Sequence, residues 1–162
     1  MVKAKLYLET TIPSYLAARP SRDLVVAAYQ EITHEWWELR RADFDLYVSE
    51  LVIQEAQAGD PQLAKRRLDL IAGLPVLTVS SEILELAEDL IAGGSVPRKA
   101  LRDATHIATA TVFSCEYLLT WNCRHIANAE LQRMIRRLVD RHGYEAPILC
   151  TPQELMGERG QA

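Results

Sequence analysis

The stretch "KLYLETTIPSYL", from Lys5 to Leu16, decides how the rest of the chain is interpreted. Its first residues continue an apolar run over 4–8 that predicts a short buried strand. Glu9 follows where this run stops, and Pro13 suits the first turn of a short helix, because its missing N–H costs little there. The sequence therefore places an acidic side chain at the exit of a core strand.

Strands and helices alternate along the remaining sequence. We expect further strands at 46–48, 76–79, 117–120 and 147–150, and helices at 22–41, 50–58, 61–73, 82–92, 97–113 and 129–142. The expected N-caps are Ser21, Ser49, Ser80 or Ser81, and Asn128, and Pro152 opens a short last helix. This alternation predicts one α/β domain over 1–162, with a mainly parallel central sheet of about five short strands.

Composition and charge limit the classes of function. The chain has 162 residues, of which 49% are hydrophobic, and a formal net charge of -4. This charge argues against a nucleic-acid binder that uses its whole surface, but it allows a local basic patch. The three cysteines form no CxxC pair, which favours a reducing cytoplasm over a disulfide framework or a zinc ribbon. We expect no signal peptide and no membrane contact, since no apolar run reaches roughly 18 residues.

Four polar side chains occupy positions where an α/β sheet binds ligands. In such sheets the ligand site lies beyond the carboxyl ends of the strands, at a topological switch point. Glu9 and Asn122 follow two predicted strands directly. Asp103 lies beside the apolar stripe of "LRDATHIATA", and Glu55 lies in the helix of "SELVIQEAQAGD".

Convergence of these groups would require a cation. Two carboxylates about 4 Å apart repel by about 4 kcal/mol at an effective dielectric constant of about 20. Oxygen ligands from Asp, Glu and Asn suit Mg²⁺ or Mn²⁺ better than zinc. Each residue also has an ordinary structural interpretation: a turn residue, a helix-dipole partner or a solvated side chain. Only their joint placement favours a metal site.

Four segments in this order carry a resemblance to a known family: "YLETTIPSYL", "SELVIQEAQAGD", "RDATHIATA" and "YLLTWNCRHIAN". With them the chain resembles PIN-domain proteins of the VapC-type toxin class over about residues 6–155. The resemblance implies a PIN-like three-layer α/β/α sandwich and a metal-dependent endoribonuclease. It also implies a protein antitoxin as partner and a homodimer.

The resemblance assigns the family's acidic quartet to particular positions. The candidate catalytic residues are Glu9, Glu55, Asp103 and Asn122, and the metal ligands for Mg²⁺ or Mn²⁺ are Glu9, Asp103 and Glu55. The family commonly has Asp at the first position, whereas Glu is longer by roughly 1.5 Å. Asn122 carries no charge, so the site holds three formal negative charges.

The expected reaction is hydrolysis of an RNA phosphodiester by a metal-activated water. Asp103 is the first candidate for direct ligation and Glu9 the next. Glu55 would ligate through water or help to activate the nucleophile, and Asn122 would position a water or the phosphate. His106, one turn after Asp103, suits either a proton transfer or, more often at such positions, a hydrogen bond within the core.

Basic and hydroxyl side chains near these positions are candidates for substrate binding, since phosphate contacts supply most non-specific affinity for RNA. The basic candidates are Arg98, Arg102 and Arg124, and the resemblance adds Thr10 and Thr11, the hydroxyl residues that follow the first acid. A second set of arginines follows helical spacing and suits either a solvated face or contact with RNA or a partner. It consists of Arg133, Arg136, Arg137 and Arg141.

The main alternative is a catalytically weak or inactive PIN-like module that acts through RNA or protein binding, suggested by Glu9 and Asn122. A nucleotide-binding module is disfavoured, because the sequence has neither G-x-G-x-x-G after the first strand nor G-x-x-x-x-G-K-[ST]. An aspartyl phosphatase would need an Asp after the first strand, which "LETT" does not supply.

Overall fold

The computed structural model describes residues 2–157. Within them the chain forms seven α-helices, two short 3₁₀ helices and five strands. The strands are β1 (Ala4–Leu8), β2 (Phe44–Ser49), β3 (Val76–Leu77), β4 (Tyr117–Leu119) and β5 (Ile148–Cys150). The helices are α1 (Thr11–Ala17), α2 (Leu24–Leu39), α3 (Glu50–Ala56), α4 (Pro61–Ile71), α5 (Ser81–Ala92), α6 (Leu101–Val112) and α7 (Ala129–Arg141), with η1 (Arg41–Asp43) and η2 (Arg98–Ala100).

All strand pairs are parallel, in the order β3-β2-β1-β4-β5. The chain first builds the sheet outward from β1 through β2 to β3, and then crosses to the other side of β1 to place β4 and β5. The topological switch point therefore lies between β1 and β4, where Leu8 pairs with Leu119. The predicted parallel sheet of about five short strands is confirmed.

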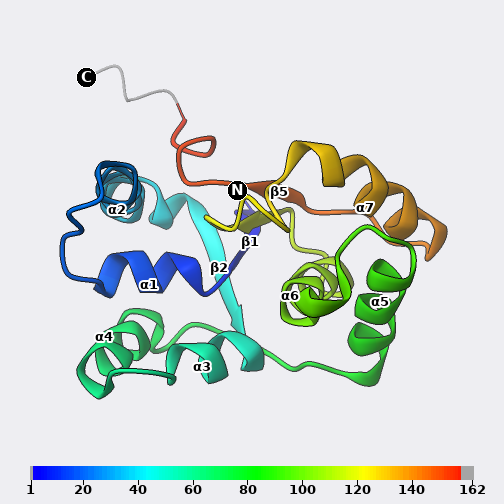
Figure 1. Ribbon diagram of the computed structural model, residues 1–162, viewed down its shortest axis with the longest axis horizontal. Coiled ribbons are helices and arrows are strands. Elements are labelled where there is room, and N and C mark those ends of the chain that lie inside the picture. The colour runs from blue at the N-terminus through cyan, green and yellow to red at the C-terminus, as the bar shows by residue number, and fades with distance from the viewer. Residues whose placement is uncertain (1, 158–162) are drawn as a thin grey trace.

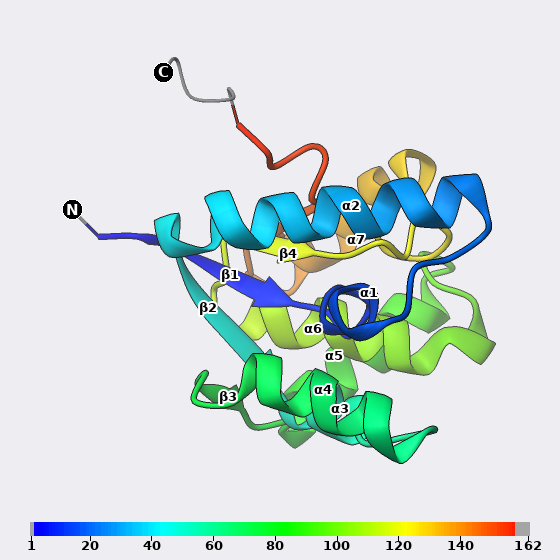
Figure 2. The same cartoon turned by 90° about the vertical axis from the view of Figure 1, so that its left-hand side faces the viewer.

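Helices cover both faces of the sheet and complete the predicted α/β/α sandwich. In Figure 1, α1, α2 and α4 lie on one side of the strands, and α5, α6 and α7 lie on the other. Figure 2 views the first group from the front, with the strands and α6 behind it. Within the groups, α1 packs against α2 and α4, and α5 packs against α6 and α7.

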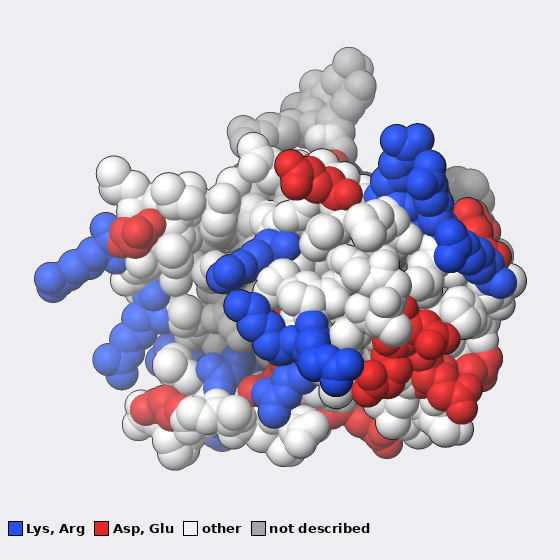
Figure 3. Space-filling model, turned by 45° about the vertical axis from the view of Figure 1, so that its right-hand side comes forward, with Lys and Arg blue, Asp and Glu red and all other residues white. Residues whose placement is uncertain are grey.

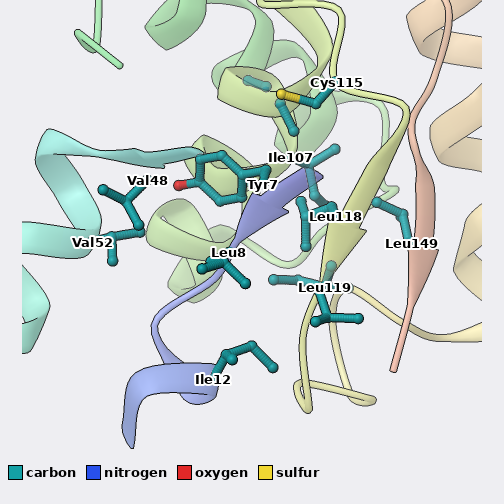
Figure 4. Close-up of a cluster of buried hydrophobic side chains, with 14 of the residues drawn as sticks. Tyr7, Leu8, Ile12, Val48, Val52, Ile107, Cys115, Leu118, Leu119 and Leu149 are labelled. Carbon is teal, nitrogen blue, oxygen red and sulfur yellow. The ribbon is translucent and has the colours of Figure 1, made fainter. Parts of the chain in front are cut away.

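The core forms around β1. Leu6, Tyr7 and Leu8 are fully buried, as expected for a central parallel strand that is covered on both faces. Figure 4 shows them among side chains from both flanking layers, with the hydroxyl of Tyr7 directed toward the segment that carries Val48 and Val52. A polar atom thus enters an otherwise apolar core next to the end of β2.

Several local predictions differ from the structure. Asp23, not Ser21, caps α2, because its carboxylate accepts the N–H groups of Val25 and Val26. The helix expected over 97–113 begins as η2 and continues as α6. No helix forms after Pro152 within residues 2–157; the Glu154 carboxylate instead accepts the N–H and hydroxyl of Thr151 and holds a turn.

All three cysteines are free thiols, and burial raises the pKa of Cys115 to about 11 and that of Cys150 to about 12. In the part of the chain that the structure describes, no helix is both long and apolar enough to cross a membrane.

Candidate functional site

Glu9 lies at the switch point and forms hydrogen bonds that connect the carboxyl ends of β1 and β4. Its backbone N–H donates to the carbonyl of Leu119 at 3.1 Å, which extends the ladder by one bond. Its buried carboxylate accepts three hydrogen bonds: from the N–H of Thr11 at 2.7 Å, from the Thr11 hydroxyl at 2.8 Å and from the Thr120 hydroxyl at 2.6 Å. These donors fix the orientation of the acid at the end of β1.

The same two threonines connect Glu9 to the loop after β4. The N–H of Trp121 donates to the Thr11 hydroxyl at 2.8 Å, and the N–H of Asn122 donates to the Thr120 hydroxyl at 2.9 Å. The Asn122 side-chain carbonyl accepts the N–H of His125 at 3.0 Å and so caps the following turn. Asn122 therefore shapes the loop, and its carbonyl oxygen is already hydrogen-bonded.

Asp103 pairs with a histidine from that loop. Nδ1 of His125 lies 2.8 Å from Oδ2 of Asp103, and both side chains are partly exposed. Asp103 lies in the first turn of α6, where the helix dipole stabilises a negatively charged carboxylate. Within residues 2–157 its other oxygen, Oδ1, has no hydrogen-bond partner. This oxygen remains available to a ligand.

Glu55 lies near the end of α3, and only one oxygen of its carboxylate has hydrogen-bond partners within residues 2–157. Its Oε1 accepts the Thr10 hydroxyl at 2.6 Å and lies 2.6 Å from Nε2 of His106. Burial alone would raise the pKa of Glu55, but His106, Thr10 and the positive charge of Arg102 together lower it below its ordinary value. Glu55 is therefore a carboxylate at neutral pH. Its Oε2 has no hydrogen-bond partner among the described residues.

A buried chain of polar groups extends from Glu55 into the core. His106 Nδ1 lies 2.6 Å from the Tyr7 hydroxyl, which lies 2.8 Å from the hydroxyl of Ser49. Ser49 Oγ also accepts the N–H of Val52 at 3.2 Å and caps α3, as predicted. Burial raises the pKa of Tyr7 well above its ordinary value, and the charges of Glu9 and Glu55 raise it further. Tyr7 therefore keeps its proton between two carboxylates.

The structure brings the predicted residues to one end of the sheet but keeps their carboxylates separately bonded. Hydrogen bonds link Glu9 with Thr11 and Glu55 with Thr10, and the loop residue His125 links Asp103 with Asn122. In residues 2–157 no group of three or more His, Cys, Asp or Glu side chains is placed to hold a metal ion. Each of the three acids has its own internal donors, and metal ligation by Glu9, Asp103 and Glu55 stays a prediction.

The predicted substrate-binding cations lie around these acids. Arg98 lies in η2, Arg102 in the first turn of α6 and Arg124 in the loop after β4, and all three are exposed. Within the described part of the chain, Arg98 and Arg124 form no ion pair. Figure 3 shows Lys and Arg side chains gathered across the middle of one face, with Asp and Glu side chains collected beside them. The negative net charge thus coexists with a locally basic surface.

Sequence reasoning missed four residues that organise this site: Tyr7, Ser49 as a partner of Tyr7, Thr120 and His125. The segment "YLLTWNCRHIAN" contains two of them, and His125 lies three residues after Asn122, the spacing of a capped turn. Tyr7 lies in an apolar run and gives no such signal. Its role depends on which helices cover β1.

Comparisons with known proteins support the fold. No family model and no curated protein matches the sequence. Among solved structures, VapC20 of Mycobacterium tuberculosis, a sarcin-ricin loop cleaving toxin, aligns with 13% identity over 70% of this chain and 87% of its own, with a TM-score of 0.52.

A second solved structure also aligns with most of this chain. VapBC2 from Rickettsia felis, bound to a DNA fragment from its promoter, aligns with 17% identity over 80% of this chain and 92% of that chain, with a TM-score of 0.54. The resemblance inferred from the four sequence segments is thereby confirmed at the level of the fold. The chain has the PIN-like α/β/α fold of VapC-type toxins.

Proposed function

We propose that this protein is a metal-dependent endoribonuclease and the toxin of a toxin–antitoxin pair. The observation that carries the proposal is the pair of partly exposed carboxylates, Asp103 and Glu55. Each is bonded to a histidine through one oxygen, while its other oxygen has no hydrogen-bond partner within residues 2–157. They project near the switch point of a PIN-like fold, where ligands of open parallel sheets bind. The likeness to a ribonuclease toxin supports the substrate class.

The donor set fits a hydrated Mg²⁺ or Mn²⁺. Mg²⁺ is usually bound through one or two carboxylates and keeps several waters or substrate phosphate oxygens. Asp103 Oδ1 and Glu55 Oε2 are the two oxygens that would hold it, and Glu9 Oε2 keeps one lone pair beside its bond to Thr11. When bound, the ion would lower the pKa of a water and offset the charge that develops on the phosphate.

The chain's own residues would orient the reacting groups. His125 holds Asp103, and His106 with Thr10 holds Glu55, so neither carboxylate has to be ordered when substrate arrives. Arg98, Arg102 and Arg124 would contact RNA phosphates. The hydroxyls of Thr10 and Thr11 donate to Glu55 and Glu9, and contact of these threonines with substrate stays a prediction.

Partners and location follow from the same proposal. We expect a protein antitoxin, in keeping with the likeness to VapBC2, as well as a homodimer and a cytoplasmic location. A second candidate function is a PIN-like module that binds RNA or protein without cleavage. It is favoured by Glu9, whose carboxylate is engaged by three internal donors, and by the uncharged Asn122.

The first prediction separates these two functions. We expect saturable binding of Mg²⁺ and Mn²⁺ in calorimetric titrations, and metal-dependent cleavage of a single-stranded RNA. Asp103→Asn should abolish the binding and reduce cleavage at least about 100-fold, since it removes a charged ligand. The matched control is Asp140→Asn on the exposed face of α7, which should change neither. Metal-independent RNA binding that is unchanged in Asp103→Asn would support the non-catalytic module.

A further inference from the structure

Glu55 stands at the end of a buried hydrogen-bonded chain that the proposed reaction does not by itself require. The chain runs from the N–H of Val52 through Ser49, Tyr7 and His106 to Oε1 of Glu55. Ser49 and Tyr7 are fully buried and His106 is almost so. Three polar residues from β1, β2 and α6 are therefore placed in the core at the cost of their hydration.

The direction of every hydrogen bond in this chain is determined by its two ends. The backbone N–H of Val52 can only donate, so Ser49 Oγ accepts from it. Among the described residues, the Ser49 hydroxyl has no acceptor for its own proton except Tyr7. Tyr7 must then donate its proton to Nδ1 of His106, which leaves Nε2 as the protonated nitrogen that donates to the Glu55 carboxylate.

We infer that Tyr7, supported by Ser49, is a positioning residue: its hydroxyl donates to Nδ1 of His106 and orients the imidazole so that Nε2–H holds the carboxylate of Glu55. The Tyr7 and His106 rings also meet edge to face, with centroids 5.7 Å apart, which restricts rotation of the imidazole. His106 and Thr10 both bind Oε1 of Glu55, which leaves Oε2 without a hydrogen-bond partner among the described residues. This inference rests on the proposed function only for the consequence to activity.

The experiment uses Tyr7→Phe, which removes one hydroxyl and keeps the ring. The control is Tyr47→Phe on β2: Tyr47 is the strand partner of Tyr7, and its hydroxyl has no hydrogen bond within residues 2–157. Nitrogen-15 NMR of the histidines should show His106 as a single Nε2–H tautomer in the wild type and in Tyr47→Phe. Tyr7→Phe leaves Nδ1 of His106 without its donor, so the Nδ1 resonance should shift to that of an unbonded imine nitrogen while Nε2 keeps its proton for the Glu55 carboxylate. Tyr7→Phe should also lower kcat about 10-fold, as is typical for partners of a site's ligands, with KM unchanged.

A second pair of variants covers the case in which Tyr7→Phe does not fold. His106→Gln keeps an amide N–H that reaches the place of Nε2, whereas His106→Leu fills the buried space without a donor. We expect His106→Gln to retain most of the activity and His106→Leu to lose about 10-fold more. A merely structural role predicts the opposite order, because the apolar side chain suits the core better.

The outcomes distinguish this inference from the proposed function. An Nδ1–H tautomer in the wild type, or an Nδ1 resonance unchanged in Tyr7→Phe, would overturn the positioning role whatever the activity. Equal activity of His106→Gln and His106→Leu would overturn it as well. Absence of cleavage in the wild type, with the expected shift of the Nδ1 resonance, would reject the nuclease and leave the positioning of Glu55 intact.

Discussion

At the scale of single residues, Glu9 shows how this chain accommodates a longer acid at the end of β1. The extra carbon of Glu relative to Asp requires a compensating change in geometry. The carboxylate turns back onto the N–H of Thr11, at the start of α1, and reaches across to the hydroxyl of Thr120. Glu9 thus also links the ends of β1 and β4 through hydrogen bonds. Its part in metal binding stays a prediction.

Glu55 carries a pH-dependent prediction. An unfolded Glu has a pKa of about 4.3, and the folded value is lower. Ionised Glu55 therefore stabilises the fold above about pH 4.3, and this stabilisation is lost as the pH falls through the lower folded-state pKa. We expect Glu55→Gln to reduce the free energy of unfolding at neutral pH, by an amount that shrinks as the solution is acidified.

Urea denaturation at a series of pH values measures this difference. The control is Glu130→Gln, an exposed residue in the first turn of α7. A stability difference for Glu55→Gln that stays constant across the acid range would contradict the assigned pKa shift.

At the scale of elements, α6 and α3 present the reactive groups together. Asp103 and His106 lie three residues apart on α6 and so share one face of that helix. His106 then contacts Glu55 on α3, which starts directly where β2 ends. The site depends on the start of α3 as much as on its acid.

The N-cap of α3 gives a prediction at this scale. Ser49→Ala removes the acceptor for the N–H of Val52 and a hydrogen-bond partner of Tyr7, both fully buried. We expect it to lower the free energy of unfolding by about 2–3 kcal/mol, more than an ordinary cap. Ser80→Ala, which removes the half-buried cap of α5, should cost about 1 kcal/mol. Equal losses in urea denaturation would show that the contact with Tyr7 adds no stability.

At the scale of the whole molecule, a chain of net charge -4 has to bind a polyanion through a local surface. Arg98, Arg102 and Arg124 are exposed candidates for one such surface, and the exposed arginines of α7 are candidates for a second. Each phosphate contact contributes counterion release, so salt dependence counts contacts independently of affinity. The salt dependence of RNA binding therefore measures how many phosphate contacts this basic surface makes.

We expect Arg124→Gln to reduce the slope of log affinity against log salt by about 0.7, the value for one phosphate contact on a single strand. The measurement is fluorescence anisotropy of a labelled single-stranded RNA, with Asp103→Asn in all proteins to prevent cleavage. Arg136→Gln on α7 is the comparison, and an equal change there would add α7 to the RNA path. An unchanged slope for Arg124→Gln would remove that residue from the interface.

The sequence by itself determined the features that depend on near neighbours in the chain. Local patterns predict the strand over 4–8, the caps at Ser49 and Asn128, and the polar residues Glu9 and Asn122 after two strands, and the structure agrees. The resemblance to PIN-domain proteins added the fold. A single domain over 1–162 stays a prediction.

Only the tertiary structure decided how the acids are held. Tyr7 and His106 lie 99 residues apart, Thr120 and Glu9 lie 111 apart, and His125 and Asp103 lie 22 apart. These pairs depend on strand order and on which helix covers β1, and neither leaves a periodic signal in the sequence. For the same physical reason, the sequence could not show that Glu9, Glu55 and Asp103 each have their own hydrogen-bond partners.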